Sequence, residues 1–194
     1  MKSYKGFTLI EVMVSVSIFA MVMLIATGSV FSIVEANKKT HTLKSVMTNL
    51  NFALESMARE IRVGFRYACG SSVALSATAN CSNGDTTFRF KANHDVDADG
   101  NYDAADNNDQ VEYSISADNR IMKRVYGNNS SFLAITASEI HITALKFYVT
   151  GAGTSEFPGK QPKVVITIQG YAGSDTTQSA FNIETTLSQR AIDS

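Results

Sequence analysis

The chain has 194 residues, of which 44% are hydrophobic and 18% are charged, and its formal net charge is −1. This balance is typical of a globular protein and excludes an intrinsically disordered chain. The near-neutral charge argues against a generally basic surface, so we expect no nucleic-acid partner. The length allows one ordinary domain plus an appendage.

The apolar residues are concentrated near the N-terminus. No charged residue occurs between Val12 and Val34. About 23 residues in a helix are enough to cross a hydrocarbon core of roughly 30 Å. Lys2 and Lys5 precede this run as in an export signal, but no small-residue cleavage site follows it. The segment therefore predicts a membrane-spanning helix with a soluble domain behind it.

Glu11 is an ionisable residue at the start of this apolar segment. An acid at membrane depth costs a few kcal/mol, so it usually has a partner and a purpose. The segment Lys5-Gly6-Phe7-Thr8-Leu9-Ile10-Glu11, followed by the apolar run, resembles the type IV prepilin signature. The resemblance implies cleavage between Gly6 and Phe7 by a membrane-embedded prepilin peptidase, and N-methylation of the new Phe7 amine. Gly6 has no side chain, so a protease can hold the backbone closely there.

The resemblance gives Glu11 a role in assembly. After cleavage Phe7 bears a terminal ammonium, and Glu11 lies one helical turn further along the same face. In a packed filament the carboxylate can neutralise the ammonium of a neighbouring subunit, which removes the cost of burying either charge alone. The alternative is a plain signal anchor in which Glu11 sits at the membrane interface.

A single long helix is expected to follow. No proline occurs before Pro158, so nothing interrupts a helix from about Phe7 to Arg62 that ends at Gly64. Beyond Val34 the pattern becomes amphipathic. Its apolar stripe comprises Leu43, Val46, Met47, Leu50, Leu54, Met57 and Ile61. A free coiled coil is the rival, but the stripe is too short to prefer it. The expected organisation is a cleaved leader at 1–6, a transmembrane or filament-core helix at 7–34, an amphipathic half at 35–64 and an exported β-rich head at 65–194.

After Gly64 the apolar period changes to two. Phe88 and Phe90 alternate with Arg89 and Lys91, which predicts a strand. Similar patterns predict strands at 111–115, 121–125, 164–168 and 181–187, and a further strand that ends with Leu145, Phe147 and Val149. Short strands after one long helix predict an α+β fold with a mostly antiparallel sheet laid on the helix stripe. The resemblance implies the same pilin-like architecture.

Cys69 and Cys81 bracket a small loop in the predicted head. An exported head meets an oxidising compartment, which makes a disulfide the expected state. Closing a loop of this length should stabilise the fold by about 3 kcal/mol in the chain-entropy model. A metal pair or reactive thiols are the alternatives, although no histidine lies beside the two cysteines.

An aspartate-rich loop matches the spacing of calcium-binding loops. Carboxylates stand at positions 1, 3, 5, 9 and 12 of that pattern, and the seventh position would offer its backbone carbonyl. The candidate ligands are Asp95, Asp97, Asp99, Asn101, Asp103 and Asp106. Gly100 falls at the sharp turn, but Asp106 replaces the usual glutamate, and Asp109 is an alternative ligand for that position. Since strands flank the loop, we expect an isolated structural Ca²⁺ site rather than an EF-hand, the alternative being a solvated acidic loop.

The remaining residues carry little chemistry. His41, His94 and His141 are scattered, with no spacing to a nucleophile that would support a catalytic triad. No phosphate-binding glycine motif occurs either. We therefore do not expect an enzyme.

Four segments carry a finer resemblance to W-type minor pilins and J-type pseudopilins. They are residues 49–62, the strand 109–113, the strand 121–124, and the final strand 181–190, which ends in Leu-Ser-Gln-Arg. This resemblance implies a minor pilin that primes or caps a type IV pilus. Its partners would be other minor pilins, the major pilin, the prepilin peptidase and the inner-membrane assembly platform. It would lie in the bacterial inner membrane with its head in the periplasm, and then in the filament. The alternatives are a minor pseudopilin of a type II secretion system and a calcium-dependent tip adhesin.

Overall fold

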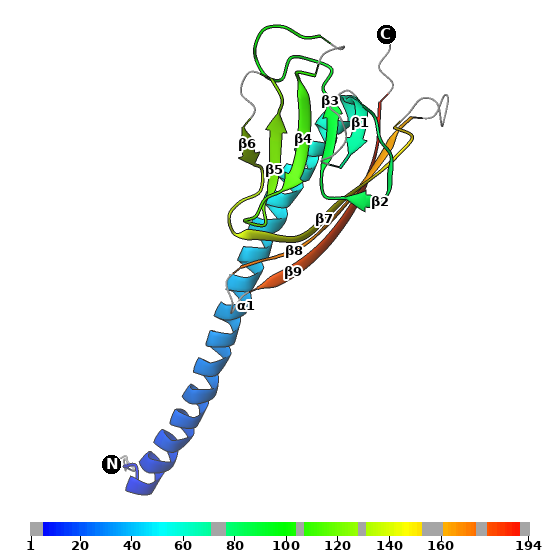
Figure 1. The fold of residues 1–194 in the computed structure, drawn as a ribbon. Coiled ribbons are helices and arrows are strands. Elements are labelled where there is room, and N and C mark those ends of the chain that lie inside the picture. The colour runs from blue at the N-terminus through cyan, green and yellow to red at the C-terminus, as the bar shows by residue number, and fades with distance from the viewer. Residues whose placement is uncertain are drawn as a thin grey trace. The chain divides into compact units, whose positions relative to one another are not determined.

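The computed structural model describes residues 6–70, 77–103, 107–127, 131–152, 161–173 and 178–190. One helix, α1 (Leu9–Val63), precedes the strands within these residues (Figure 1). The strands are β1 (Phe65–Cys69), β2 (Cys81–Asp85), β3 (Phe88–Lys91), β4 (Gln110–Ile115), β5 (Ile121–Val125), β6 (Phe132–Ala134), β7 (Ile140–Thr150), β8 (Lys163–Ala172) and β9 (Ser179–Ser188). The chain divides into two compact units, Met1–His41 and Thr42–Ser194, and the boundary falls inside α1.

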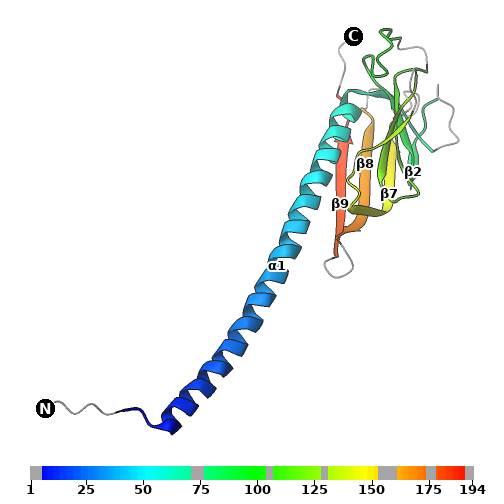
Figure 2. The same ribbon diagram turned by 90° about the vertical axis from the view of Figure 1, so that its left-hand side faces the viewer.

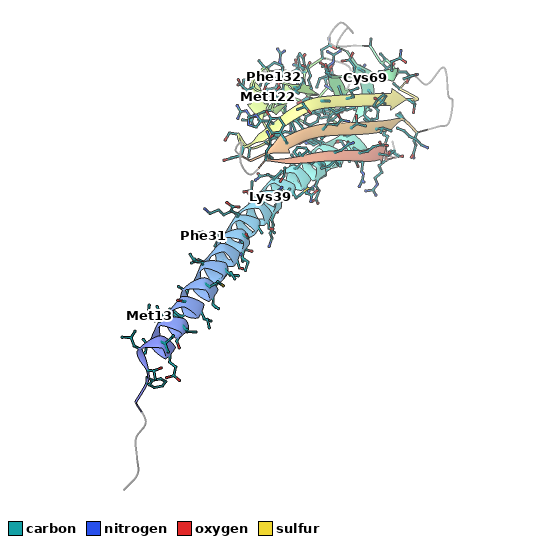
Figure 3. The ribbon with its side chains drawn as sticks, turned by 90° about the horizontal axis from the view of Figure 1, so that it is seen from below. Met13, Phe31, Lys39, Cys69, Met122 and Phe132 are labelled. Carbon is teal, nitrogen blue, oxygen red and sulfur yellow. A yellow bond between two sulfur atoms is a disulfide. The ribbon has the colours of Figure 1, made fainter. Side chains whose placement is uncertain are left out.

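The first unit contains the part of α1 that is apolar on every side. Met13 and Phe31 are 62% and 70% exposed, and their side chains project from the helix (Figure 3). The helix contains an 18-residue window with a mean hydropathy of 2.5, none of it buried, which is sufficient to cross a membrane by length and composition. A helix that is apolar all round needs nonpolar surroundings, because water would meet an uninterrupted hydrophobic surface.

The polar side chains of this part also suit nonpolar surroundings. Every Ser and Thr between Val12 and Val34 donates its hydroxyl to a carbonyl of the preceding helical turn. Ser15 donates to the Glu11 carbonyl at 2.7 Å, for example. These hydrogen bonds satisfy each hydroxyl within the helix, so none of them requires water.

The second unit is built on the amphipathic part of α1. Its buried stripe comprises Val46, Leu50, Ala53, Met57 and Ile61. The prediction that Met47 belongs to the stripe was wrong, because its side chain is 41% exposed. Met47 is one residue from Val46, which rotates it by about 100° away from the buried line. Ala53, which was not in the predicted stripe, is buried.

The head contains two antiparallel sheets. One has the strand order β1-β3-β4-β5-β6, and the other has the order β2-β7-β8-β9. Figure 2 shows the second sheet beside the upper part of α1. The α+β, pilin-like fold is confirmed, although the strands form two sheets and β1, β2 and β6 were not predicted. Those three strands are short, and β2 contains Asn83 and Gly84 in place of alternating apolar residues.

One hydrophobic core joins α1 and both sheets. Phe88 of β3 stacks on Phe147 of β7 with 5.3 Å between ring centroids, so an aromatic pair connects the two sheets. Tyr67 of β1 packs on Phe88 at 5.7 Å, and its hydroxyl donates to the carbonyl of Ile61 in α1. Leu50 and Met57 of α1 are fully buried in the same core. The helix and both sheets therefore stabilise one another.

Two residues that follow β9 donate hydrogen bonds to carbonyls at the end of α1. Gly64 follows the helix as predicted, and a Cβ there would overlap the ring of Phe90. The Gln189 side chain donates to the Gly64 carbonyl at 2.9 Å, and the Arg190 amide donates to the Arg62 carbonyl at 2.7 Å. The last carbonyls of a helix lack partners within it, and these two bonds supply them.

Candidate functional site

The predicted cleavage bond lies just outside α1. Gly6, Phe7 and Thr8 have no regular secondary structure, and the helix begins at Leu9. Phe7 is 88% exposed, and no atom lies within 4 Å of the position that a Cβ on Gly6 would take. The rest of the predicted leader, residues 1–5, lies outside the described residues. A peptidase would therefore meet open, non-helical backbone at the Gly6–Phe7 bond.

Glu11 and Thr8 form a reciprocal cap at the start of α1. The Thr8 amide and hydroxyl donate to Glu11 Oε2 at 3.0 and 2.9 Å. In return the Glu11 amide donates to the Thr8 hydroxyl at 3.4 Å. This arrangement is a capping box, in which a Thr and a Glu three residues later satisfy amides that the first turn leaves without partners. The Thr-x-x-Glu spacing of this cap is visible in the sequence, although the cap itself was not predicted.

Glu11 therefore has two physical properties that a variant can separate. Its carboxylate accepts hydrogen bonds that hold the first turn of α1, and it also brings a negative charge to the apolar segment. A negative charge at a helix N-terminus is further stabilised by the helix dipole.

Three carboxylates of the acidic loop meet in one place. Asp95, Asp97 and Asp99 each offer an oxygen, and these oxygens all lie within 4.8 Å of one another. The amides of Ala98 and Gly100 donate to the two oxygens of Asp95 at 2.7 and 2.9 Å, which folds the loop around that side chain. Oxygen donors close together on a tight loop are the ligands that Ca²⁺ takes, so the residues present fit this ion.

Of the other predicted ligands, the structure describes Asn101 and Asp103 but not Asp106. Asn101 and Asp103 are exposed residues of the same loop, and Asp103 is outside the group of three carboxylates. Asp106 lies outside the described residues. Gly100 has a φ of 82°, a left-handed conformation that glycine adopts without strain, as its position at the sharp turn predicted.

A buried ion pair that the sequence analysis did not predict lies beneath this loop. The side chains of Lys91 and Asp109 are both 0% exposed, with 3.9 Å between Lys91 Nζ and Asp109 Oδ2. Strand alternation placed Lys91 on the solvent side of β3, but all four residues of β3 are buried. Tyr102 and Asn108 cover Lys91 on this face of the strand. The Tyr102 hydroxyl donates to the Ala92 carbonyl, and Lys91 Nζ donates to the Asn108 carbonyl.

Cys69 and Cys81 are joined in a disulfide with a Cα–Cα distance of 6.0 Å. Cys69 ends β1 in the five-stranded sheet, and Cys81 begins β2 in the four-stranded sheet. The bond therefore connects the two sheets covalently as well as closing a loop.

The histidines lie on separate elements. His41 is in α1, His94 contacts Asn93 in the acidic loop, and His141 stacks on Tyr171 with 5.1 Å between ring centroids. In the part of the chain that the structure describes, none of these contacts forms a nucleophile–base pair.

Two family models match the chain. Residues 1–27 match a model described as the prokaryotic N-terminal methylation motif, which includes the Gly6–Phe7 bond and the capping box. Residues 39–190 match a model described as prepilin peptidase-dependent protein B, which spans the amphipathic half of α1 and all the strands described above. Searches of curated proteins and of solved structures found no match.

Proposed function

Because the chain belongs to the prepilin peptidase-dependent protein B family, we propose that it is a minor pilin that primes or caps assembly of a type IV pilus. The observation that carries this proposal is the N-terminal arrangement. An open Gly6–Phe7 bond stands directly before a capped helix whose apolar surface is exposed on every side.

Processing is the first step of the proposed mechanism. The prepilin peptidase cleaves the bond between Gly6 and Phe7 and N-methylates the new amine. Thr8 and Glu11 remain in the mature chain, so the capping box survives cleavage and the helix still begins at the same place. The mature N-terminus then carries a positive charge one turn from the Glu11 carboxylate.

The exposed apolar part of α1 supports a role in which the subunit moves from the membrane into the filament, two nonpolar environments. It is first held in the bacterial inner membrane with the head in the periplasm, and it then packs among the helices of neighbouring subunits. Exposing this surface to water would cost about 25 cal/mol for each Å² of apolar area, which opposes any free intermediate. Glu11 neutralises the Phe7 ammonium of a neighbour during this transfer.

The head contributes binding surfaces rather than catalysis in this proposal. It would contact the other minor pilins and the major pilin, while the inner-membrane assembly platform handles the helix. The family match supports a pilus-related context, and the choice between a type IV pilus and a type II secretion pseudopilus is left to experiment.

A deletion strain tests the role. Surface pili and secreted enzyme activity are measured with the gene absent and after complementation with the wild-type chain, Gly6→Leu or Gly28→Leu. Both glycines have open space around them, and Gly28 lies within α1, away from the cleaved bond, so the second variant is a matched control for processing. We expect pili to be lost on deletion, restored by wild type and not restored by Gly6→Leu. By mass spectrometry the N-terminus of Gly6→Leu stays unprocessed, whereas that of Gly28→Leu is cleaved.

Other outcomes of this experiment identify the alternatives. Lost secretion with normal pili would make the chain a minor pseudopilin. Normal pili and secretion with lost surface attachment would favour a tip adhesin. Full restoration by Gly6→Leu would contradict the processing step.

We also propose that the acidic loop binds a structural Ca²⁺ ion through Asp95, Asp97 and Asp99, joined by Asn101, Asp103 and Asp106. The convergence of three carboxylates within 4.8 Å supports this proposal, since such groups repel one another unless a cation neutralises them. Calcium would fix the loop on the head and leave the pilin role unchanged.

Calcium should raise the melting temperature of the full-length protein in detergent, because an ion that binds only the native state stabilises it. At 100 times the dissociation constant the gain is about 2.7 kcal/mol. Scanning calorimetry in calcium and in chelator measures it for wild type, Asp97→Asn and Asp118→Asn. Asp118 is an exposed aspartate of the β4–β5 turn, so its variant controls for the loss of one negative charge. Identical curves in calcium and chelator for wild type would rule out the site.

A further inference from the structure

Asp109 contacts the acidic loop from beneath. It is fully buried immediately before β4, and its φ of 53° is a left-handed conformation that aspartate tolerates better than most residues. Its Oδ1 accepts the amides of Val96 at 2.7 Å and Asp97 at 3.2 Å. Asp109 Oδ1 thus holds the backbone at Asp97, the middle residue of the three carboxylates.

The second oxygen of Asp109 has a different environment. Oδ2 is buried, accepts no hydrogen bond within the described residues, and lies 3.9 Å from Lys91 Nζ. Lys91 Nζ donates to the Asn108 carbonyl at 2.6 Å and lies 5.2 Å from the centre of the Tyr102 ring. Lys91 therefore balances the charge of Asp109 in a site that water does not reach.

Asp97 is also confined on another side. A Cβ on Gly127 would overlap the Asp97 carboxylate, and the φ of 131° at Gly127 disfavours any other residue there. The Asp109 amide donates to the Tyr126 carbonyl at 2.9 Å, so Asp109 also contacts the segment that carries Gly127. The Asp97 backbone is thus held by Asp109, and the Asp97 carboxylate lies close to Gly127.

We infer that Asp109 is the positioning residue of the acidic loop, and that it acts through its hydrogen-bond acceptor and not through its charge. By holding the amides of Val96 and Asp97 it sets the geometry of the three carboxylates, and so the affinity for Ca²⁺. This inference rests on the proposed calcium site for its effect on affinity, whereas the contacts with the two amides are independent of any ion. The role of Lys91 is to make a buried carboxylate tolerable at this position.

The competing role for Asp109 is that of a direct ligand in place of Asp106. A ligand would act through its negative charge, whereas a positioning residue needs only an oxygen that accepts two amides. Asparagine keeps such an oxygen and loses the charge, and alanine loses both. The two substitutions therefore distinguish the roles.

The test uses two double variants of the full-length chain in detergent, Lys91→Met with Asp109→Asn and Lys91→Met with Asp109→Ala. Replacing Lys91 in both avoids a buried unpaired cation and keeps the net charge of both variants equal to that of wild type. Calcium chloride titrated by calorimetry should show affinity close to wild type for the asparagine variant. The alanine variant should bind about 10- to 100-fold more weakly, the range typical of groups that orient metal ligands.

Hydrogen exchange of the Val96 and Asp97 amides in metal-free protein gives a second, ion-independent measurement. Exchange should be faster in the alanine variant than in the asparagine variant, while amides of β8 stay equally protected as a check on folding. Equal affinities in the two double variants, whether weakened or not, would overturn the positioning role. If wild type binds no calcium, the proposed calcium site is wrong, but the role of Asp109 in holding the two amides is still tested by hydrogen exchange. Equal exchange rates of the Val96 and Asp97 amides in the two variants would then overturn that role.

Discussion

Glu11 combines a local and an intermolecular role in one carboxylate. Its Oε2 accepts both the amide and the hydroxyl of Thr8, which completes the first turn of α1. The same side chain is our candidate for neutralising the Phe7 ammonium of a neighbouring subunit. A loss of assembly on substitution would therefore have two explanations unless the variants keep them apart.

Glu11→Gln and Glu11→Val separate these roles. Glutamine also completes a capping box, so it should keep the first turn of α1 and lose only the charge. Valine loses both the cap and the charge. We expect both variants to be cleaved at Gly6 but to be incorporated poorly with partner subunits, as measured by co-purification from sheared filaments.

Thr8→Ala serves as the control because it weakens the cap and keeps the charge, at a cost of about 1 kcal/mol to the helix start. Normal incorporation of Glu11→Gln would show that the cap, and not the charge, is what assembly requires.

At the scale of elements, a polar contact fixes α1 against the five-stranded sheet. Glu60 of α1 accepts the Tyr113 hydroxyl of β4 at 2.7 Å and the Lys123 ammonium of β5 at 2.6 Å. Burial, followed by the charge of Glu60, raises the pKa of Tyr113 well above its ordinary value of 10.0. Burial likewise raises the pKa of Tyr67, whose hydroxyl contacts the end of α1. Both tyrosines must stay protonated for the helix to pack as it does.

The head should therefore lose stability in alkali. The folded pKa of each tyrosine exceeds its unfolded value, so the stabilisation is complete below about pH 10 and falls as the pH rises further. Each such tyrosine contributes a slope of up to about 1.4 kcal/mol per pH unit. Urea unfolding between pH 8 and 12 should show this decline in wild type.

Tyr113→Phe should be less stable at pH 8 by about 1 kcal/mol, because it loses a hydrogen bond. Its decline above pH 10 should be shallower, because one titrating group is gone. A decline identical to that of wild type would contradict the role of Tyr113.

At the scale of the molecule, the Cys69–Cys81 disulfide is a covalent cross-link between the two sheets, in addition to the backbone that connects β2 to β3. Replacing both cysteines with serine should lower the free energy of unfolding by about 3 kcal/mol, the chain-entropy value for a loop of this length. Urea denaturation of both proteins measures the difference. Reductant should lower wild type to the level of the variant and leave the variant unchanged; a variant as stable as oxidised wild type would contradict the stabilising role.

Features that depend on neighbouring residues could be predicted from the sequence. The uninterrupted helix, its end at Gly64 and the strand that contains Phe88 and Phe90 all follow from local periodicity and turn chemistry. The cap formed by Thr8 and Glu11 is equally local, and its Thr-x-x-Glu spacing was available to sequence analysis.

Features that depend on how distant segments meet could not be predicted. Lys91 alternates with Phe88 and Phe90 in the sequence, and nothing in that pattern shows that its side chain is buried against Asn108 and Tyr102. The sequence likewise offers Asp109 only as an alternative calcium ligand, and the structure shows its Oδ1 accepting the amides of Val96 and Asp97. The division of the strands into two sheets depends on the pairing of β2 with β7, which are far apart in the chain.

The closure of α1 by Gln189 and Arg190 has a consequence for biosynthesis. The helix is among the first parts of the chain to leave the ribosome, yet the donors to its Arg62 and Gly64 carbonyls come at the end of β9. A polypeptide released before Gln189 leaves both carbonyls without these donors, and one released before Ser179 also leaves β8 without a neighbour on one side. The full set of contacts at the end of α1 therefore requires a chain synthesised at least as far as Arg190.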